Sequence, residues 1–448
     1  MPHTPSPPAH LAWAGGPLGR YAVRSARGID RRLLGAGPLV VAALACVLVA
    51  LLRLQSCFAT GWSGRTPTTR MCPSDLATAV GADNLGRGLA AYLSGDLDVR
   101  QPPLTAALMS LIGGVTDAPT LLTAQRALVI TWAVLAVVLL GLMAVRVATV
   151  PGADPTQVVL SPVAALTVLV SPDLLGVALA TLGLVAWLRR RAALAGVLLG
   201  LAVMARTYPL VLLAVMVAVV LVRDPQRRPD LRPLALGALG GVVAVALPLA
   251  WHPGTVISAW RAWWAAGTSL GSPWHVPSLV GTGVPDPLAV ALAVLGWVAA
   301  AFVVALLLTR RGPAPSLAGL ALVAVAIVLV TGTAAPPGAS LWLVPLAALA
   351  GVRWRDHLVW AACEGAYFVA HWLFVNGLVE HTKGLPAGWY AVFLLVRLAG
   401  IAWLARAAVP SISGRHAPTG TLDRLPSACG KPPPVVGDAA YPPVTEGP

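Results

Sequence analysis

Long apolar runs, separated by short clusters of arginine, are the feature of this sequence that most restricts its fold. Hydrophobic residues make up 57% of the chain and charged residues only 11%, whereas about a quarter of the residues are charged in an ordinary soluble domain. Backbone polar groups in lipid must bond within the protein, so a run of roughly 18 apolar residues crosses as a helix. The sequence therefore predicts an all-α polytopic membrane protein.

The arginine clusters predict the orientation, because basic residues gather on the cytoplasmic side. If the short apolar stretch 103–115 crosses, the clusters at 189–191 and 223–232 face outward; if it does not, every cluster faces inward. We therefore predict that 103–115 is a juxtamembrane or re-entrant helix. About 12 spans follow, within a range of roughly 11–13: about 35–53, 127–147, 157–171, 173–188, 192–205, 208–222, 233–250, 287–309, 315–333, 339–351, 356–378 and 388–407.

Three regions result from this topology. Residues 1–34 form a basic, disordered N-terminus, residues 35–409 form the transmembrane domain, and residues 410–448 form a Pro-rich, disordered tail. We expect the protein to lie in the cell membrane, with both ends in the cytoplasm. The transmembrane domain carries two external segments, 54–125 and 251–286.

In a soluble protein, the net charge of +14 would suggest nucleic acid as a partner. Most arginines, however, stand in the clusters that orient the spans. We therefore expect a membrane partner and no nucleic acid.

Two of the five cysteines, Cys57 and Cys72, flank a loop in the external segment 54–125. Disulfides persist outside the cytoplasm, so we predict a disulfide here, with two free thiols as the alternative. No cysteine or histidine group has metal-ligand spacing. We expect no metal and no cofactor.

Asp75 opens a segment, 75–93, that is predicted to be an amphipathic helix. One interpretation is that Ser74 or Asp75 caps this helix. The other is that a carboxylate at the membrane surface acts as general base for an acceptor hydroxyl. Arg87 lies in the same segment, where it either binds a lipid phosphate, pairs with Asp83 or is solvated.

Other ionisable residues stand at or near membrane depth, where they are costly and often functional. Arg206 ends a span on the external side, against the charge rule, so it either binds an anionic ligand such as a lipid phosphate or snorkels. Asp173 starts a span, where it is a cap or an anion at a helix N-terminus. Glu364 and His371 share one face of a span, as a proton relay or an intrahelical structural network.

The external segment 251–286 is rich in tryptophan, a residue that prefers the membrane interface. We expect an amphipathic helix on the outer surface, with carbohydrate stacking as the alternative. The tryptophans are Trp251, Trp260, Trp263, Trp264 and Trp274.

Short motifs follow one another along residues 35–407: Cys57, Trp62, Cys72-Pro73-Ser74-Asp75, Arg87-Gly88-Leu89, Gln101-Pro102-Pro103-Leu104-Thr105, Pro172-Asp173-Leu174-Leu175, Ala195-Gly196-Val197-Leu198-Leu199-Gly200, Arg206-Thr207-Tyr208-Pro209-Leu210, Leu341-Trp342-Leu343-Val344-Pro345-Leu346, Trp360 and Glu364-Gly365-Ala366-Tyr367-Phe368. In this order they resemble the motifs of the GT-C superfamily, in an actinobacterial branch close to glycosyltransferase family 87. These are polytopic membrane glycosyltransferases that use polyprenyl-phosphate sugars.

The resemblance implies a GT-C-like fold and a mannosyltransferase-like activity. It implies that a hexose passes from a polyprenyl-phosphate donor to a lipid or glycan acceptor of the cell envelope. Asp75 would be the catalytic base, and Arg206, with Arg87, would bind the donor phosphate. The remaining candidates are expected to line the substrate cavity: Gln101, Asp173, Tyr208, Glu364 and His371.

Two other classes of function stay open. A transporter or flippase of lipid-linked sugar would show paired broken helices at membrane depth. A catalytically inactive partner in a cell-envelope complex is the second alternative. It is favoured by the segment 332–340, which lacks the Lys, Gln and Tyr of the family pattern.

Overall fold

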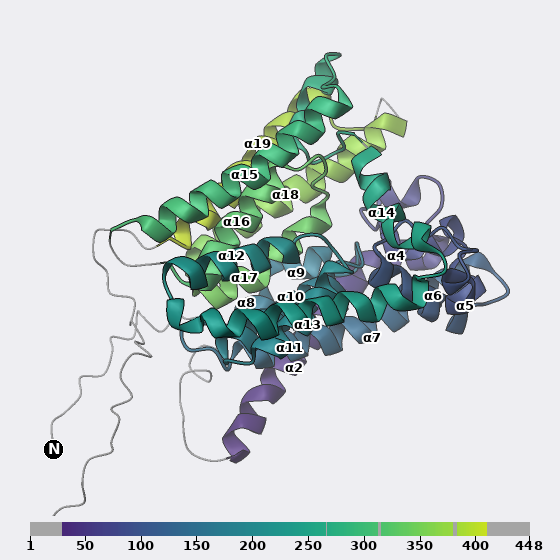
Figure 1. The fold of residues 1–448 in the computed structure, drawn as a ribbon. Helices are drawn as coiled ribbons and strands as arrows, with labels where there is room; N and C mark the ends of the chain where they lie inside the picture. Colours follow the sequence, from purple (N-terminus) through teal and green to yellow (C-terminus); the bar gives the residue numbers. More distant parts are fainter. Residues whose placement is uncertain (1–28, 266, 312–314, 380–382, 410–448) are drawn as a thin grey trace, which may run out of the picture. The chain divides into compact units, whose positions relative to one another are not determined.

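The computed structural model describes residues 29–265, 267–311, 315–379 and 383–409, and every regular element in these ranges is a helix (Figure 1). The predicted tail 410–448, and residues 1–28 of the predicted N-terminal region, lie outside the described residues. The α-helices are α2 (Ile29–Thr60), α3 (Thr66–Thr69), α4 (Asp75–Ala82), α5 (Gly88–Leu93), α6 (Pro103–Val115), α7 (Leu121–Val147), α8 (Thr156–Leu160), α9 (Pro162–Thr167), α10 (Leu174–Leu188), α11 (Ala192–Val203), α12 (Pro209–Val222), α13 (Arg228–Ala246), α14 (Pro253–Ala265), α15 (Asp286–Thr309), α16 (Leu317–Thr331), α17 (Leu343–Ala350), α18 (Trp354–Val379) and α19 (Ala387–Ala407). The 3₁₀ helices are η2 (Leu85–Arg87), η3 (Pro225–Arg227), η4 (Leu247–Leu249), η5 (Pro273–Val280) and η6 (Pro337–Trp342).

Six helical stretches in the described part of the chain are long and apolar enough to cross a membrane: Gly35–Thr60, Leu121–Val147, Pro225–Leu249, Asp286–Thr309, Trp354–Leu378 and Ala387–Ala407. The other apolar helices have only 10–17 residues, fewer than the roughly 20 that a full crossing takes. The all-helical prediction is thus confirmed for the described residues. The number of crossings, about 12, stays a prediction.

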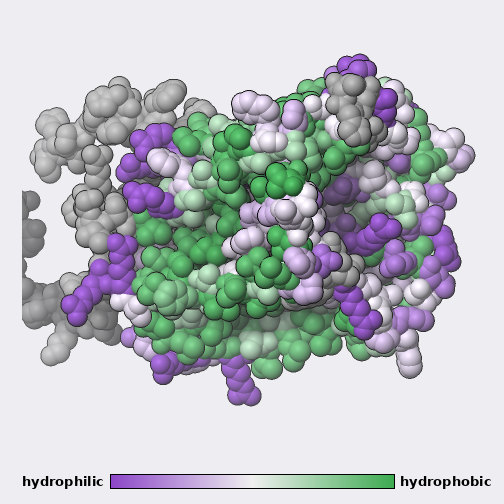
Figure 2. All heavy atoms as spheres, turned by 90° about the horizontal axis from the view of Figure 1, so that it is seen from above, coloured by the Kyte–Doolittle hydropathy of each residue, from purple (hydrophilic) through white to green (hydrophobic). Residues whose placement is uncertain are grey.

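The long helices expose large apolar side chains instead of burying them. On α15, Leu295, Val298 and Phe302 are 60%, 59% and 62% exposed. Figure 2 shows hydrophobic residues over much of the surface in view, with hydrophilic residues gathered at its edges. Such broad apolar faces are unusual on a soluble monomer and are what a helix needs where it meets lipid.

Two predicted elements are divided in the structure. The predicted amphipathic helix 75–93 forms α4, η2 and α5 instead. Asn84, with a left-handed φ of 51°, separates α4 from η2, and Gly88, with φ 79°, separates η2 from the rest of α5. The predicted span 157–171 forms the short helices α8 and α9, which break where Ser161 precedes Pro162. A proline disfavours helical backbone at the residue before it and removes a donor. The predicted helix 103–115, by contrast, matches α6.

Helices α11 and α13 pack backbone against backbone. On α11, a Cβ atom at Gly196 or Gly200 would overlap the carbonyl oxygen of Leu234 or Ala238 on α13. On α13, Gly237 approaches the carbonyl oxygen of Ala193 just as closely. Small residues spaced four apart allow this approach in membrane helices, so the two helices form a tight, apolar pair.

Two non-α-helical segments meet inside the helical array. The first interrupted segment, residues 168–173, joins α9 to α10, and the second, residues 332–342, joins α16 to α17 and includes η6. A Cβ atom at Gly338 in the second would lie 2.5 Å from the Ser171 hydroxyl oxygen in the first. Both segments are largely buried. Irregular backbone is tolerated at membrane depth only where protein or a water-filled cavity satisfies it, which makes this meeting point the place to look for chemistry.

Candidate functional site

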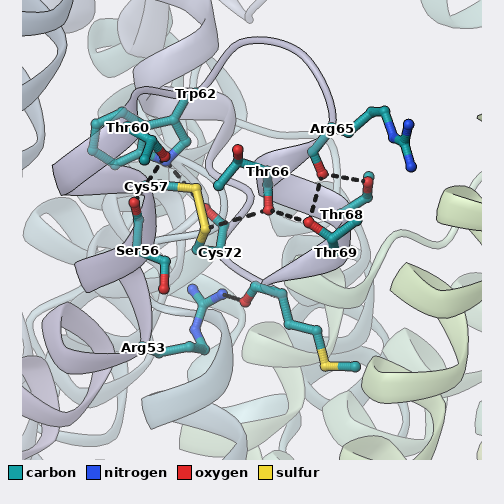
Figure 3. The surroundings of a disulfide bond; sticks show 11 residues. Arg53, Ser56, Cys57, Thr60, Trp62, Arg65, Thr66, Thr68, Thr69 and Cys72 are labelled. Atoms are coloured by element: carbon teal, nitrogen blue, oxygen red, sulfur yellow. Dashed lines mark hydrogen bonds between the residues drawn. A yellow bond between two sulfur atoms is a disulfide. The ribbon is translucent and has the colours of Figure 1, made fainter.

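A disulfide closes the loop before Asp75 (Figure 3). Cys57, near the end of α2, is bonded to Cys72 as predicted, with the Cα atoms 5.9 Å apart. The indole N–H of Trp62 donates to the Cys72 carbonyl oxygen over 3.1 Å. The strap formed by residues 71–75 is therefore fixed to the end of α2 just before the acidic residue.

The same strap is bound to the first interrupted segment. The Ser74 hydroxyl donates to the Leu169 carbonyl oxygen over 2.7 Å, and the Asp75 backbone N–H donates to the Val170 carbonyl oxygen, also over 2.7 Å. Ser74 stands at the N-cap position of α4, yet its side chain makes no capping bond. Ser74 is therefore the N-cap residue by position, as one interpretation predicted, but its hydroxyl holds the strap in place instead of capping the helix.

The carboxylate of Asp75 is exposed to solvent, while the protein around it removes part of its hydration. This desolvation raises the pKa of Asp75 to about 6. The negative charge of Asp173 raises this pKa further, and the positive charge of Arg206 lowers it. Asp75 thus lies within electrostatic reach of both residues, and it changes charge close to neutral pH.

Asp173 and Arg206 form an ion pair between the guanidinium Nε and a carboxylate oxygen. The Asp173 side chain is 6% exposed and that of Arg206 26%. Asp173 stands at the N-cap position of α10, but its side chain makes no capping hydrogen bond. The carboxylate pairs with Arg206 instead. Only Nε of Arg206 is engaged in a described hydrogen bond, which leaves its two Nη groups for another oxyanion.

Helix α6 is bound to the turn that carries Arg206. The Leu104 N–H donates to the Met204 carbonyl oxygen over 2.9 Å, and the Thr105 hydroxyl donates to the Ala205 carbonyl oxygen over 3.2 Å. Gln101 precedes α6, and its side-chain oxygen is buried without a hydrogen-bond partner. Gln101 is thus brought to the Arg206 side of the molecule with an unused acceptor.

Tyr208 also belongs to this neighbourhood. It is the N-cap residue of α12, two residues after Arg206, and packs against Trp342 of the second interrupted segment, with 5.2 Å between the ring centroids. The indole nitrogen of Trp342 and the hydroxyl of Ser171 are buried without partners. We call Asp75, Asp173, Arg206 and Tyr208 the Asp75 site.

Glu364 and His371 take part in a second polar group, between α18 and α19. The Glu364 carboxylate pairs with Arg397, whose Nε lies 3.0 Å from it, and accepts from the Trp360 indole over 3.2 Å. His371 bonds to the Tyr367 hydroxyl over 3.1 Å, and no described hydrogen bond joins it to Glu364. The predicted intrahelical network is found in the Trp360–Glu364 and Tyr367–His371 bonds within α18, but the Glu364–Arg397 pair extends it to α19. No described bond forms the direct proton relay between Glu364 and His371.

Arg397 connects this network to the second interrupted segment. Its Nη groups donate to the carbonyl oxygens of Ala335 and Pro336 and to the hydroxyl of Ser340. The Arg397 side chain is 1% exposed. A buried cation thus supplies a donor to the Ala335 carbonyl oxygen and a second donor to the Pro336 carbonyl oxygen, which also accepts from the Ala339 N–H.

Arg87 makes its described bonds to Asp96 and none to the residues of the Asp75 site. Its guanidinium donates to the Asp96 carbonyl oxygen over 2.8 Å and lies 3.9 Å from the Asp96 carboxylate. The predicted pairing with Asp83 is wrong, and no described bond joins Arg87 to Asp75 or Arg206. The exposed position of Arg87 leaves its role in phosphate binding a prediction.

The tryptophan-rich segment 251–286 contains α14 and η5. Trp251 is 89% exposed, whereas the Trp274 indole donates to the Thr331 carbonyl oxygen over 2.8 Å. The side chains of Trp263 and Trp264 lie outside the described residues. Among the described side chains, that of Trp251 thus offers aromatic surface of the kind predicted, whereas the Trp274 indole nitrogen is bonded within the protein.

Among the described residues, no group of three or more His, Cys, Asp or Glu side chains could hold a metal ion. The Asp75 site itself contains two carboxylates and one guanidinium. Its polar atoms suit hydrogen bonds to hydroxyl and phosphate oxygens.

Two arginines of this region were missed by the sequence analysis. Arg397 is the ion-pair partner of Glu364, and Arg53 donates to the Met71 carbonyl oxygen in the strap over 2.9 Å. Each was visible as a charge inside an apolar span, a signal that marks functional candidates.

Comparison of the chain with protein-family models, with curated proteins and with solved structures finds no match.

Proposed function

We propose that this protein is a membrane glycosyltransferase, a mannosyltransferase in the manner of the GT-C superfamily. It would move a hexose from a polyprenyl-phosphate carrier to a lipid or glycan acceptor on the outer face of the cell membrane. About 12 spans, with both termini in the cytoplasm, complete the proposal. The observation that carries it is the placement of an accessible carboxylate, Asp75, beside the Asp173–Arg206 pair.

In this mechanism Asp75 accepts the proton of the acceptor hydroxyl. The hydroxyl oxygen attacks the anomeric carbon, the bond from that carbon to the phosphate oxygen breaks, and the phosphate leaves with the electron pair. A pKa of about 6 suits the role, because a general base works best when its pKa lies near the working pH.

Arg206 would stabilise the departing phosphate. Its Nε is held by Asp173, so its Nη groups are oriented before the donor arrives. Preorganised donors aimed at developing negative charge are the largest single contribution in many enzymes. Asp173 is then a positioning residue, because it acts through Arg206.

A transporter or flippase of lipid-linked sugar is the second candidate. It is favoured by the two interrupted segments, which meet at Gly338 and Ser171, since transporters bind their substrates at paired broken helices. Movement of a polyprenyl-phosphate sugar across vesicles that hold the purified protein, without change to the sugar linkage, would support this candidate.

The test of the transferase is the passage of radiolabelled mannose from polyprenyl-phosphate mannose into product, in membranes that contain this chain. We expect Asp75→Asn to lower the rate by about a hundredfold or more, the contribution of a general base. Asp98→Asn removes an exposed carboxylate of the same segment and should leave the rate unchanged. Full activity of the Asp75→Asn protein would exclude Asp75 as the base.

The inactive-partner alternative gives a different result. It predicts that the folded wild-type protein binds the donor and transfers no label, whichever hexose the donor carries. Label in a product that disappears with Asp75→Asn excludes it.

A further inference from the structure

Arg53 lies on α2, seven residues or about two turns before the end of the candidate span Gly35–Thr60. One of its terminal nitrogens, Nη1, donates to the Met71 carbonyl oxygen over 2.9 Å (Figure 3). Its guanidinium carbon lies 5.3 Å from the centre of the Phe368 ring on α18. A carbonyl and an aromatic face therefore hold the cation in place.

The other edge of the same guanidinium is unused. Nε and Nη2 are both buried, and neither has a hydrogen-bond partner. These two nitrogens form the side of an arginine that grips two oxygens of one carboxylate or phosphate. A buried charged donor without a partner is costly, so the position calls for an oxyanion.

Two other arginines of this region pair with a carboxylate, whereas Arg53 pairs with none in the described part of the chain. Arg206 pairs with Asp173, and Arg397 pairs with Glu364. Among the described residues no Asp or Glu oxygen lies within ion-pair distance of Arg53. The missing negative charge would then come from a ligand.

The strap connects this unused edge to the Asp75 site. Met71, which accepts the Arg53 bond, has a left-handed backbone with φ 51°, four residues before Asp75. The disulfide at Cys72 and the bonds of Ser74 and Asp75 to the first interrupted segment fix the residues between them. A ligand held by Arg53 would thus have a defined position relative to the carboxylate.

We propose that Arg53 binds the phosphate group of a lipid through its Nε and Nη2 atoms. Two sources share this chemistry: the phosphate of a polyprenyl-phosphate carrier and the headgroup phosphate of a bulk phospholipid. The first source rests on the proposed function, whereas the second does not. The phosphate site itself stands on the geometry of Arg53.

The test is a binding titration of the purified full-length protein in detergent, followed by native mass spectrometry. The probes are a polyprenyl phosphate, the matching polyprenol without phosphate, and phosphatidylglycerol. We expect Arg53→Gln to weaken polyprenyl-phosphate binding by about tenfold or more, the value of a charge-assisted hydrogen-bond pair. Polyprenol binding should stay the same.

Arg70→Gln is the matched control, because it removes an equal charge from an exposed side chain of the same loop and should change no affinity. Arg53→Lys keeps the charge without the two-nitrogen edge, so its affinity should fall between those of wild type and Arg53→Gln. A thermal melt of each variant establishes whether it is folded. If the Arg53→Gln protein is not folded, the affinity of the Arg53→Lys protein tests the proposal instead.

Competition separates the two sources. If phosphatidylglycerol fails to displace the polyprenyl phosphate, the site belongs to the carrier; if it competes equally, the site takes a headgroup phosphate. A folded Arg53→Gln protein that binds polyprenyl phosphate as tightly as wild type would overturn the proposal. Because binding is measured without transfer, an inactive protein with an Arg53-dependent phosphate site would contradict the proposed function alone.

Discussion

The α11–α13 pair and the two interrupted segments satisfy their backbone hydrogen bonds in different ways. In α11 and α13 the backbone hydrogen bonds lie within each helix, and glycines such as Gly200 let the two backbones touch. In the interrupted segments the backbone leaves the α-helix, and side chains bond to its carbonyl groups, as Arg397 does for Ala335 and Pro336. The first region needs small residues; the second needs charges.

This difference shows where function can be placed in an apolar protein. A regular helix pair presents no free polar group, so it can hold the fold but has no atoms for chemistry. The interrupted segments bring backbone and side-chain polar atoms to one place, and the Asp75 strap bonds to one of them. The place where buried polar groups find hydrogen-bond partners is therefore also the place of the candidate site.

The largest effect is expected from a substitution of Arg397, which bonds to the second interrupted segment. Arg397→Met leaves Glu364 buried without its cation and removes the arginine donor from the Ala335 carbonyl oxygen of the second interrupted segment. We expect a loss of about 3–5 kcal/mol in the free energy of unfolding, measured by denaturation of the purified protein. The double variant Arg397→Met, Glu364→Gln should recover part of it, because no buried charge remains; equal loss in both would contradict the account.

The disulfide gives the next effect. Replacing Cys57 and Cys72 together by Ala removes a cross-link between residues 15 apart, which is worth about 3 kcal/mol for a loop of that size. The rate of sugar transfer should also fall, because Asp75 loses its fixed strap. Replacing Cys46, a buried free thiol within α2, by Ala is the control, and its transfer rate should match that of wild type.

A smaller effect is expected from a substitution in the α11–α13 pair. In Gly200→Ala the new Cβ meets the Ala238 carbonyl oxygen, whereas Gly240 on α13 has nothing within 4 Å. We expect Gly200→Ala to cost about 1–3 kcal/mol by overpacking, and Gly240→Ala to be neutral or stabilising because Ala favours helix. Thermal melts of both variants compare them directly, and equal melting temperatures would show that α11 and α13 do not pack as described.

Much of the helical framework could be predicted from sequence. Each predicted span contains a helix, and α6 matches its predicted range because an apolar run with a proline at its first turn defines both ends. The disulfide could be predicted because two cysteines stood in one short external loop. Hydropathy and spacing are local properties, and these features depend on them.

The rotation of each helix about its axis could not be predicted. Glu364 and Arg397 are 33 residues apart on different helices, and no local pattern says that their side chains face each other. The breaks in 75–93 and 157–171 were also missed, because an apolar run hides where the chain leaves the helix. The resemblance assigned Asp75, Asp173 and Arg206 to one site, but only the structure shows that Asp173 and Arg206 form an ion pair.

The central claim is that Asp75 acts as a base beside Asp173, and the pH dependence of the transfer rate tests it most directly. Only the ionised carboxylate accepts a proton, so the rate should rise through about pH 6 and level off above it. Because the charge of Asp173 raises the pKa of Asp75, Asp173→Asn should move this rise to lower pH. A wild-type rate that is flat from pH 5 to pH 8, or an unmoved rise in folded Asp173→Asn protein, would contradict the account.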